Sequence, residues 1–153
     1  IIIGPMVEEA DTIVAKASMI KPEPIIHLST REMAKLMAEA DLAIGVAGFT
    51  SWERCCLGLP ALIMTAANNQ KDIAAALSKA EACRLVGDTA SINAIEIAKH
   101  LTEMVTHHDE CKNMAIAAST ICDGEGAEKV AIILDQKICP RDKLQISTKP
   151  NLN

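Results

Sequence analysis

The sequence is organised around the stretch from Ala40 to Gln70, which reads ADLAIGVAGFTSWERCCLGLPALIMTAANNQ. A short apolar run at residues 42–44 breaks into a loop of small residues, and a helix is expected to start at Thr50 or Ser51. A Gly-Leu-Pro sequence ends that helix, and a second apolar run follows at residues 61–64. The pattern predicts a strand, a loop, a helix and a second strand in succession.

The loop between the first strand and the helix, Gly45 to Gly48, is a candidate anion-binding turn. Backbone N–H groups at the start of a helix have no intrahelical partner and carry the positive end of the helix dipole. A phosphate group is therefore stabilised there without any basic side chain. The sequence thus predicts a site for an anionic ligand at the N-terminus of this helix.

The same alternation of apolar strands and helices continues on both sides of the central stretch. Short strands are predicted near residues 1–4, 25–28, 42–46, 61–65 and 83–86. Such alternation is typical of βαβ units, and strands that are apolar throughout belong to parallel sheets covered on both faces. We therefore predict an α/β fold with a parallel sheet and helices on both of its faces.

Beyond Asp88 the pattern becomes purely helical, with three further helices that end near Leu134. From residue 136 onward the apolar period disappears. At 153 residues the chain fits one domain with a sizeable core. We expect that domain over residues 1–135 and a tail over residues 136–153.

Composition limits the partners of this domain. A net charge of −5 without a basic run argues against nucleic acid or an anionic membrane surface as a ligand. No apolar run approaches the length of a membrane span, which is about 18 residues. The six cysteines show no CxxC spacing, so buried reduced thiols in a cytoplasmic protein are the expected state.

Ligands of open parallel sheets bind beyond the carboxyl ends of the strands. Three predicted loops occupy such positions: residues 4–5, 45–51 and 65–70. In the last of them, the amides of Asn68, Asn69 and Gln70 are suited to sugar hydroxyls. For Asn68 or Asn69 taken singly, a role as the N-cap of the next helix is equally open.

Glu53 is the one acid in the central loop and helix, and it has two interpretations. The spacing from Thr50 to Glu53 matches a capping box, in which the Glu accepts the N-cap backbone N–H. Alternatively its carboxylate accepts hydrogen bonds from two ribose hydroxyls. Spacing alone favours the capping box, and the adjacent Arg54 is expected to be solvated or ion-paired.

The only two aromatic residues, Phe49 and Trp52, lie at the start of this helix. They are either a local packing anchor or a stacking surface for a ligand base, and packing is favoured because Trp is usually mostly buried. The adjacent His107 and His108 have no third ligand at metal spacing, so both are expected to face solvent, with no metal site. No nucleophile, general base and orienting acid stand in a recognisable order, and no catalytic residue is assigned.

The motif residues of the central stretch resemble a known family. The resemblance is carried by residues 40–45, Gly48, residues 50–55, residues 57–60 and residues 69–70, and a late segment at residues 123–130 extends it to about Leu134. These segments closely resemble the C-terminal domain of the UDP-sugar hydrolases of the pseudaminic-acid pathway and of spore-coat polysaccharide biosynthesis proteins. More distantly they are similar to the C-terminal half of the lipid-linked N-acetylglucosaminyltransferase of peptidoglycan synthesis.

The resemblance implies a glycosyltransferase-B architecture, in which two Rossmann-like domains bind a nucleotide sugar mainly through the second domain. It implies a UDP-sugar as ligand and no cofactor. By position it assigns Glu53 to the ribose, Gly48, Thr50 and Ser51 to the diphosphate, and Asn69 and Gln70 to the sugar. It thereby raises the ribose role of Glu53 above the capping role.

The chain departs from the family pattern in three respects. It has Ala47-Gly48-Phe49 where the family has two glycines and a small hydroxyl residue, which adds bulk beside the diphosphate. The N-terminal domain that supplies the catalytic His in the hydrolases is not matched, and neither is the first βα unit of the second domain. We therefore expect a UDP-sugar-binding domain of a hydrolase or transferase that is inactive by itself. The alternative is a non-catalytic binding or assembly module with the same fold.

Overall fold

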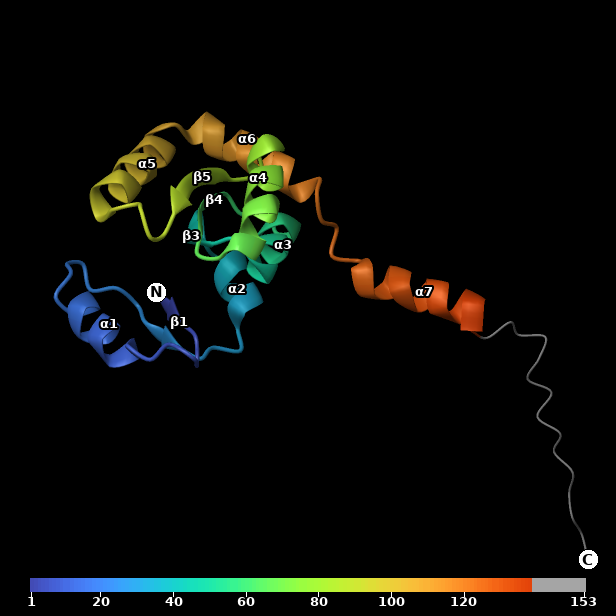
Figure 1. Ribbon diagram of the computed structural model, residues 1–153, viewed down its shortest axis with the longest axis horizontal. Helices are drawn as coiled ribbons and strands as arrows, with labels where there is room; N and C mark the ends of the chain where they lie inside the picture. The colour runs from blue at the N-terminus through green and yellow to red at the C-terminus, as the bar shows by residue number, and fades with distance from the viewer. Residues whose placement is uncertain (139–153) are drawn as a thin grey trace, which may run out of the picture. The chain divides into compact units, whose positions relative to one another are not determined.

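The computed structural model describes residues 1–138, which form an α/β structure (Figure 1). Its strands are β1 (Ile2–Ile3), β2 (His27–Leu28), β3 (Ala43–Val46), β4 (Ala61–Thr65) and β5 (Arg84–Asp88). Its α-helices are α1 (Ala10–Ala17), α2 (Met33–Ala38), α3 (Phe49–Cys56), α4 (Lys71–Lys79), α5 (Ala94–Thr106), α6 (His108–Ser119) and α7 (Gly126–Ile138). A short 3₁₀ helix, η1 (Asn68–Gln70), precedes α4. The five predicted strands are therefore confirmed.

The chain divides into two compact units, and the first comprises Ile1–Asp41. In this unit β1 and β2 form a parallel pair, with Ile2 opposite His27, and α1 makes the crossover between them. Ile3 and Ala17 are its buried apolar residues among those described. Both strands are shorter than predicted and pair with each other alone in the part of the chain that the structure describes.

The second unit begins at Leu42 and contains a parallel sheet of order β3-β4-β5. The central strand β4 pairs with β3 through Ala43 opposite Ala61 and Val46 opposite Met64. Its pairing with β5 shifts register after Ile63, where a bulge lies. The strand β4 has a neighbour on each side, and most of its residues are buried.

Helices cover both faces of β4, because alternate side chains of a strand point to opposite faces. On one face Ile63 packs in a cluster with Leu77 of α4 and Cys55 of α3. On the other face Leu62 packs with Met104 of α5 and Met114 of α6. The predicted fold class, an α/β structure with parallel strands between helices, is confirmed.

The predicted end of the central helix is also confirmed. Gly58 has a left-handed backbone, with φ of 59°, and the N–H of Leu59 donates to the Arg54 carbonyl 2.9 Å away. A Cβ on Gly58 would lie 3.2 Å from the Ala115 carbonyl oxygen of α6. Glycine is favoured there by its backbone conformation and by the close approach of α6.

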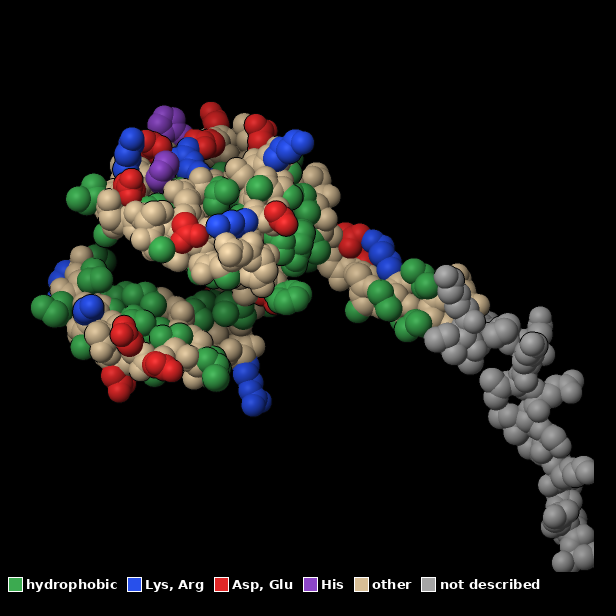
Figure 2. Space-filling model, in the orientation of Figure 1, with side chains coloured by type: hydrophobic (Ala, Val, Ile, Leu, Met, Phe, Trp, Pro, Cys, Tyr) green, Lys and Arg blue, Asp and Glu red, His purple; other side chains and the backbone are tan. Residues whose placement is uncertain are grey.

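The last described helix, α7, differs from its prediction. Figure 2 shows hydrophobic side chains on the surface of this helix. Four of them are about half exposed rather than packed in a core: Val130, Ile132, Ile133 and Leu134. The helix also continues past residue 135, where a tail was expected to begin. The rest of that predicted tail, residues 139–153, lies outside the described residues. No helix among residues 1–138 has both the length and the apolar character needed to cross a membrane.

The burial of Leu62 generates a stability prediction. Leu62→Ala should lower the free energy of unfolding by about 2–5 kcal/mol, because the Leu62 side chain of β4 is fully buried against helices α5 and α6. Leu57→Ala is the matched control, because Leu57 is exposed and should cost less than about 1 kcal/mol. Urea unfolding measures both values. Equal losses for the two variants would contradict this arrangement of the core.

Candidate functional site

The loops that follow β3 and β4 emerge at the same edge of the sheet. These strands are parallel, with Val46 opposite Met64, so their carboxyl ends lie side by side. The predicted adjacency of residues 45–51 and 65–70 is therefore confirmed within the second unit. The third predicted loop, Gly4-Pro5, follows β1 in the first unit.

The loop after β3 is anchored at Ala47 and open at Gly48. Ala47 is fully buried, and its N–H donates to the Met64 carbonyl 2.9 Å away. Gly48 has an extended backbone, and a Cβ built there would meet no atom within 4 Å. The space beside Gly48 is therefore open to a ligand.

The first turn of α3 is closed by Ser51. The Gly48 N–H donates to Ser51 Oγ at 3.2 Å, and the Ser51 N–H donates to the Gly48 carbonyl at 2.9 Å. The helix thus begins at Phe49 with Gly48 as its N-cap. The prediction of a capping box from Thr50 to Glu53 was wrong. The helix starts before Thr50, and the side chain that accepts the N-cap N–H is that of Ser51.

Two backbone donors remain free at this helix end. Among the hydrogen bonds of residues 1–138, none uses the N–H of Phe49 or Thr50. Both groups lie in the first turn of α3, at the positive end of the helix dipole. An anionic oxygen is the acceptor that such a pair of donors favours.

Arg54 lies beneath the loop. Its side chain is only 5% exposed, and Nη2 donates to the Val46 carbonyl at 2.9 Å and to Ser51 Oγ at 3.0 Å. Burial lowers the pKa of this guanidinium from its usual value, but an arginine remains charged in proteins. The prediction of a solvated or ion-paired Arg54 was wrong, because the loop folds over the side chain. No spacing in the sequence indicated this position.

Glu53 and the two aromatic residues lie on the outer side of α3. The Glu53 side chain is exposed and has no hydrogen-bond partner among the described residues. Phe49 is 90% exposed and Trp52 38% exposed, so the packing interpretation was wrong for Phe49. The Phe49 ring extends into solvent and does not fill the loop.

The loop after β4 is closed by Gln70. Its Oε1 accepts the Ala66 N–H at 2.8 Å, while the exposed Asn68 and Asn69 side chains make no hydrogen bond within the described chain. The N-cap of α4 is Gln70 without a side-chain bond. The N-cap alternative for Asn68 and Asn69 was therefore wrong, and the amide of Asn69 remains free.

Asp88 is a polar residue of the same edge that the sequence analysis missed. It ends β5 opposite Thr65, whose Oγ1 donates to Asp88 Oδ2 at 3.3 Å. Its Oδ1 accepts the Ala90 N–H at 2.9 Å. The apolar pattern indicated a strand that stopped at Val86, because Gly87 and Asp88 are not apolar.

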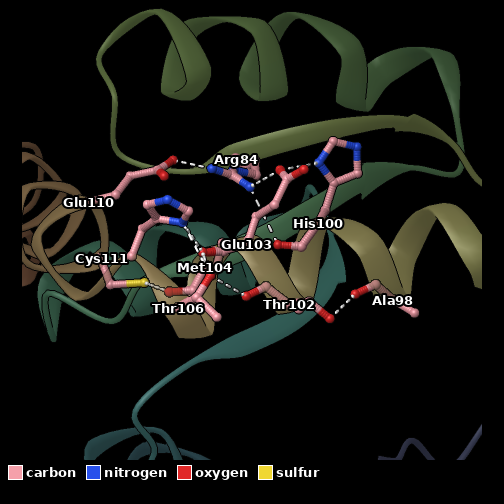
Figure 3. Close-up of polar contacts among 10 residues, drawn as sticks. Arg84, Ala98, His100, Thr102, Glu103, Met104, Thr106, Glu110 and Cys111 are labelled. Carbon is pink, nitrogen blue, oxygen red and sulfur yellow. Dashed lines mark hydrogen bonds and ion pairs between the residues drawn. The ribbon is translucent and has the colours of Figure 1, made fainter.

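A second polar cluster surrounds Arg84, at the amino end of β5 (Figure 3). Its Nη1 donates to Glu103 Oε2 at 3.0 Å and to the His100 carbonyl at 3.3 Å, and Nη2 pairs with Glu110. The charge of Arg84 is thus neutralised by two carboxylates. These bonds attach α5 and α6 to the sheet.

A hollow of about 470 Å³ adjoins this second cluster. It is lined by Ser78, Glu81, Cys83, Arg84, Leu85, Glu110, Asn113 and Met114. Because Cys83 and Arg84 precede or begin β5, the hollow lies away from the carboxyl edge. The free backbone donors and the exposed Glu53 lie elsewhere, so we place the candidate site at the carboxyl edge.

The histidine pair lies where α5 ends and α6 begins. His107 and His108 are both exposed, as predicted, and His107 Nδ1 lies 2.8 Å from the Glu103 carbonyl oxygen. Within residues 1–138 no three His, Cys, Asp or Glu side chains are grouped to hold a metal ion.

The family "Glycosyltransferase family 28 C-terminal domain" matches residues 1–132. The match covers most of the chain, so the chain belongs to this family. The match confirms the predicted class, the C-terminal half of a glycosyltransferase-B fold. Comparison with curated proteins gives no match.

The cysteines of the second unit were predicted to be buried and reduced, and only some of them are buried. Cys55 and Cys83 are buried, whereas Cys56 is exposed on α3, and all the described cysteines are free. Burial raises the pKa of the Cys83 thiol to about 11, and the nearby Cys55 adds to this effect. Cys139 lies outside the described residues.

Iodoacetamide should therefore alkylate Cys56 well before Cys83. At pH 8 a thiol with a pKa of about 11 is only about one-thousandth thiolate, and Cys83 is also buried. Peptide mass spectrometry over a time course measures the order of labelling. In urea the two rates should converge, and equal rates in the native protein would contradict the burial of Cys83.

Proposed function

We propose that this module binds a nucleoside diphosphate sugar of the UDP-linked class and serves in polysaccharide biosynthesis. The observation that carries the proposal is the pair of free N–H groups of Phe49 and Thr50 at the carboxyl edge of the sheet. This is where parallel sheets bind ligands, and free helix donors are suited to phosphate oxygens. Membership of a glycosyltransferase family supports a sugar-nucleotide ligand.

The diphosphate would lie over Gly48 and the first turn of α3. Gly48 has no neighbour in the space where a side chain would be, so a phosphate can approach the backbone. The N–H groups of Phe49 and Thr50 would donate to its oxygens. Ser51 is buried, so its hydroxyl would shape the loop from inside rather than contact the ligand.

Glu53 would bind the ribose. Its carboxylate is exposed and unpartnered among the described residues, so both oxygens are available to a vicinal diol. In the adjacent loop, Asn69 has an exposed amide for the sugar hydroxyls, and Gln70 would hold that loop through Ala66.

The reaction would be transfer of the sugar or its hydrolysis, as in the UDP-sugar hydrolases and spore-coat proteins that the central stretch resembles. Either step needs a base and an acceptor or a water held in line with the anomeric carbon. The described residues of the carboxyl edge form no nucleophile and base pair. We therefore propose that a second domain facing this edge supplies these groups.

A second candidate is a non-catalytic binding or assembly module. It is favoured by Phe49, whose 90% exposed ring lies beside the free donors where the family has a small residue. Such a ring can serve as a contact for a protein partner.

Replacing Glu53 tests the ribose role. Glu53→Gln should weaken UDP binding by about 1–3 kcal/mol, because hydrogen bonds to a charged acceptor are lost. Thermal stability should change little, because Glu53 is exposed and has no partner in residues 1–138. Glu128→Gln on α7 is the matched control and should leave affinity unchanged. Titration calorimetry measures the affinities, and equal affinity for Glu53→Gln and wild type would contradict this role.

The 153-residue chain should bind UDP without releasing sugar from UDP-sugars. Binding needs the loop and α3, whereas turnover needs the base that we assign to a second domain. Calorimetry with UDP and an assay of free sugar from several UDP-sugars test both parts. Detectable turnover would contradict the need for a second domain. The absence of binding at millimolar UDP would favour the assembly module.

A further inference from the structure

Arg54 is the one charged residue buried in the described part of the chain. None of the ion pairs in residues 1–138 includes it, and its Nε has no hydrogen-bond partner. A buried charge without a counter-charge is strongly unfavourable. Arg84 provides the contrast, because two carboxylates neutralise it. The burial of Arg54 without a carboxylate therefore requires an explanation.

The bonds of Arg54 join both ends of the loop between β3 and α3. Nη2 donates to the Val46 carbonyl, which ends β3, and to Ser51 Oγ in the first turn of α3. Ser51 Oγ also accepts the Gly48 N–H. A chain of hydrogen bonds thus runs from the guanidinium through the Ser51 hydroxyl to the Gly48 amide and holds the loop in shape.

Gly45 shows how closely the guanidinium is enclosed. A Cβ at this position would lie 2.9 Å from Arg54 Nη1, which is too close for any real contact. The Arg54 partners on the loop are neutral oxygens, which satisfy hydrogen bonds but do not cancel the charge. The positive charge of Arg54 is therefore available to attract an anionic group bound on the outer side of the loop between β3 and α3.

We propose that Arg54 is the positioning residue of this site and supplies the positive charge for the diphosphate from beneath the loop. This inference rests on the proposed nucleotide site. Arg54 would not touch the ligand. It would hold the loop so that the N–H groups of Phe49 and Thr50 stay free, and its charge would add to the helix dipole. Affinity should then rise with the negative charge of the ligand, from uridine through UMP to UDP.

The ratio of UDP affinity to uridine affinity tests this role. Arg54→Gln removes the charge but retains an amide donor, so UDP affinity should fall by about ten- to a hundredfold while uridine affinity changes little. Arg54→Lys retains the charge and should preserve most of the ratio. Titration calorimetry with uridine, UMP and UDP measures each variant.

Arg84→Gln is the matched control, because it removes an arginine whose charge is already neutralised. It should lower thermal stability and leave the ratio unchanged. An unchanged ratio in Arg54→Gln overturns the proposal. A ratio that falls as far in Arg54→Lys as in Arg54→Gln overturns the role of the charge, because Lys retains the charge but not the bonds that shape the loop. If wild type binds neither UDP nor uridine, the proposed nucleotide site itself fails, which is a different result.

Gly45→Ala decides the question if Arg54→Gln does not fold. Its Cβ would displace the guanidinium without removing it. UDP affinity should then fall several-fold with uridine affinity retained, and unchanged UDP affinity in a folded Gly45→Ala variant overturns the proposal. Far-ultraviolet circular dichroism establishes which variants are folded.

Discussion

The parallel pairing of β4 with β3 and β5 is the constraint on which the second unit depends. Parallel neighbours cannot be joined by tight turns, so each connection must cross over the sheet, and here each crossover contains a helix. The crossover helices α3 and α4 cover one face of β4, and α5 and α6, which follow β5, cover the other. The same pairing brings the carboxyl ends of the three strands to one edge, so a single interaction creates both the core and the location of the site.

The electrostatic potential at the start of α3 differs in sign from the net charge of the chain. The net charge of −5 does not favour anions in general. At the start of α3, however, two free N–H groups and the helix dipole lie above a buried arginine. Inside the protein such groups act with less screening than surface charges. These groups support the proposal that an acidic chain binds an anionic ligand at this loop.

Much of the fold was predictable because it depends on local chemistry. Apolar runs predicted all five strands, and glycine followed by proline predicted the end of α3 at Gly58. The predicted start of α3 was too late. The side chain that accepts the N-cap N–H is the Ser51 hydroxyl, whereas the prediction assigned this role to the Glu53 carboxylate. Asp88 was missed because strand pairing with β4, rather than apolar character, extends β5.

The sequence by itself determined the α/β class and the two loops of the site, because strand and helix periods and turn residues act over a few neighbours. Only the tertiary structure decided which side chains are buried. Arg54 lies beneath the loop and Phe49 extends into solvent, although both occupy the same short helix. Their environments depend on how β3 ends and how α3 packs, and contacts between elements of this kind leave no periodic pattern in the sequence.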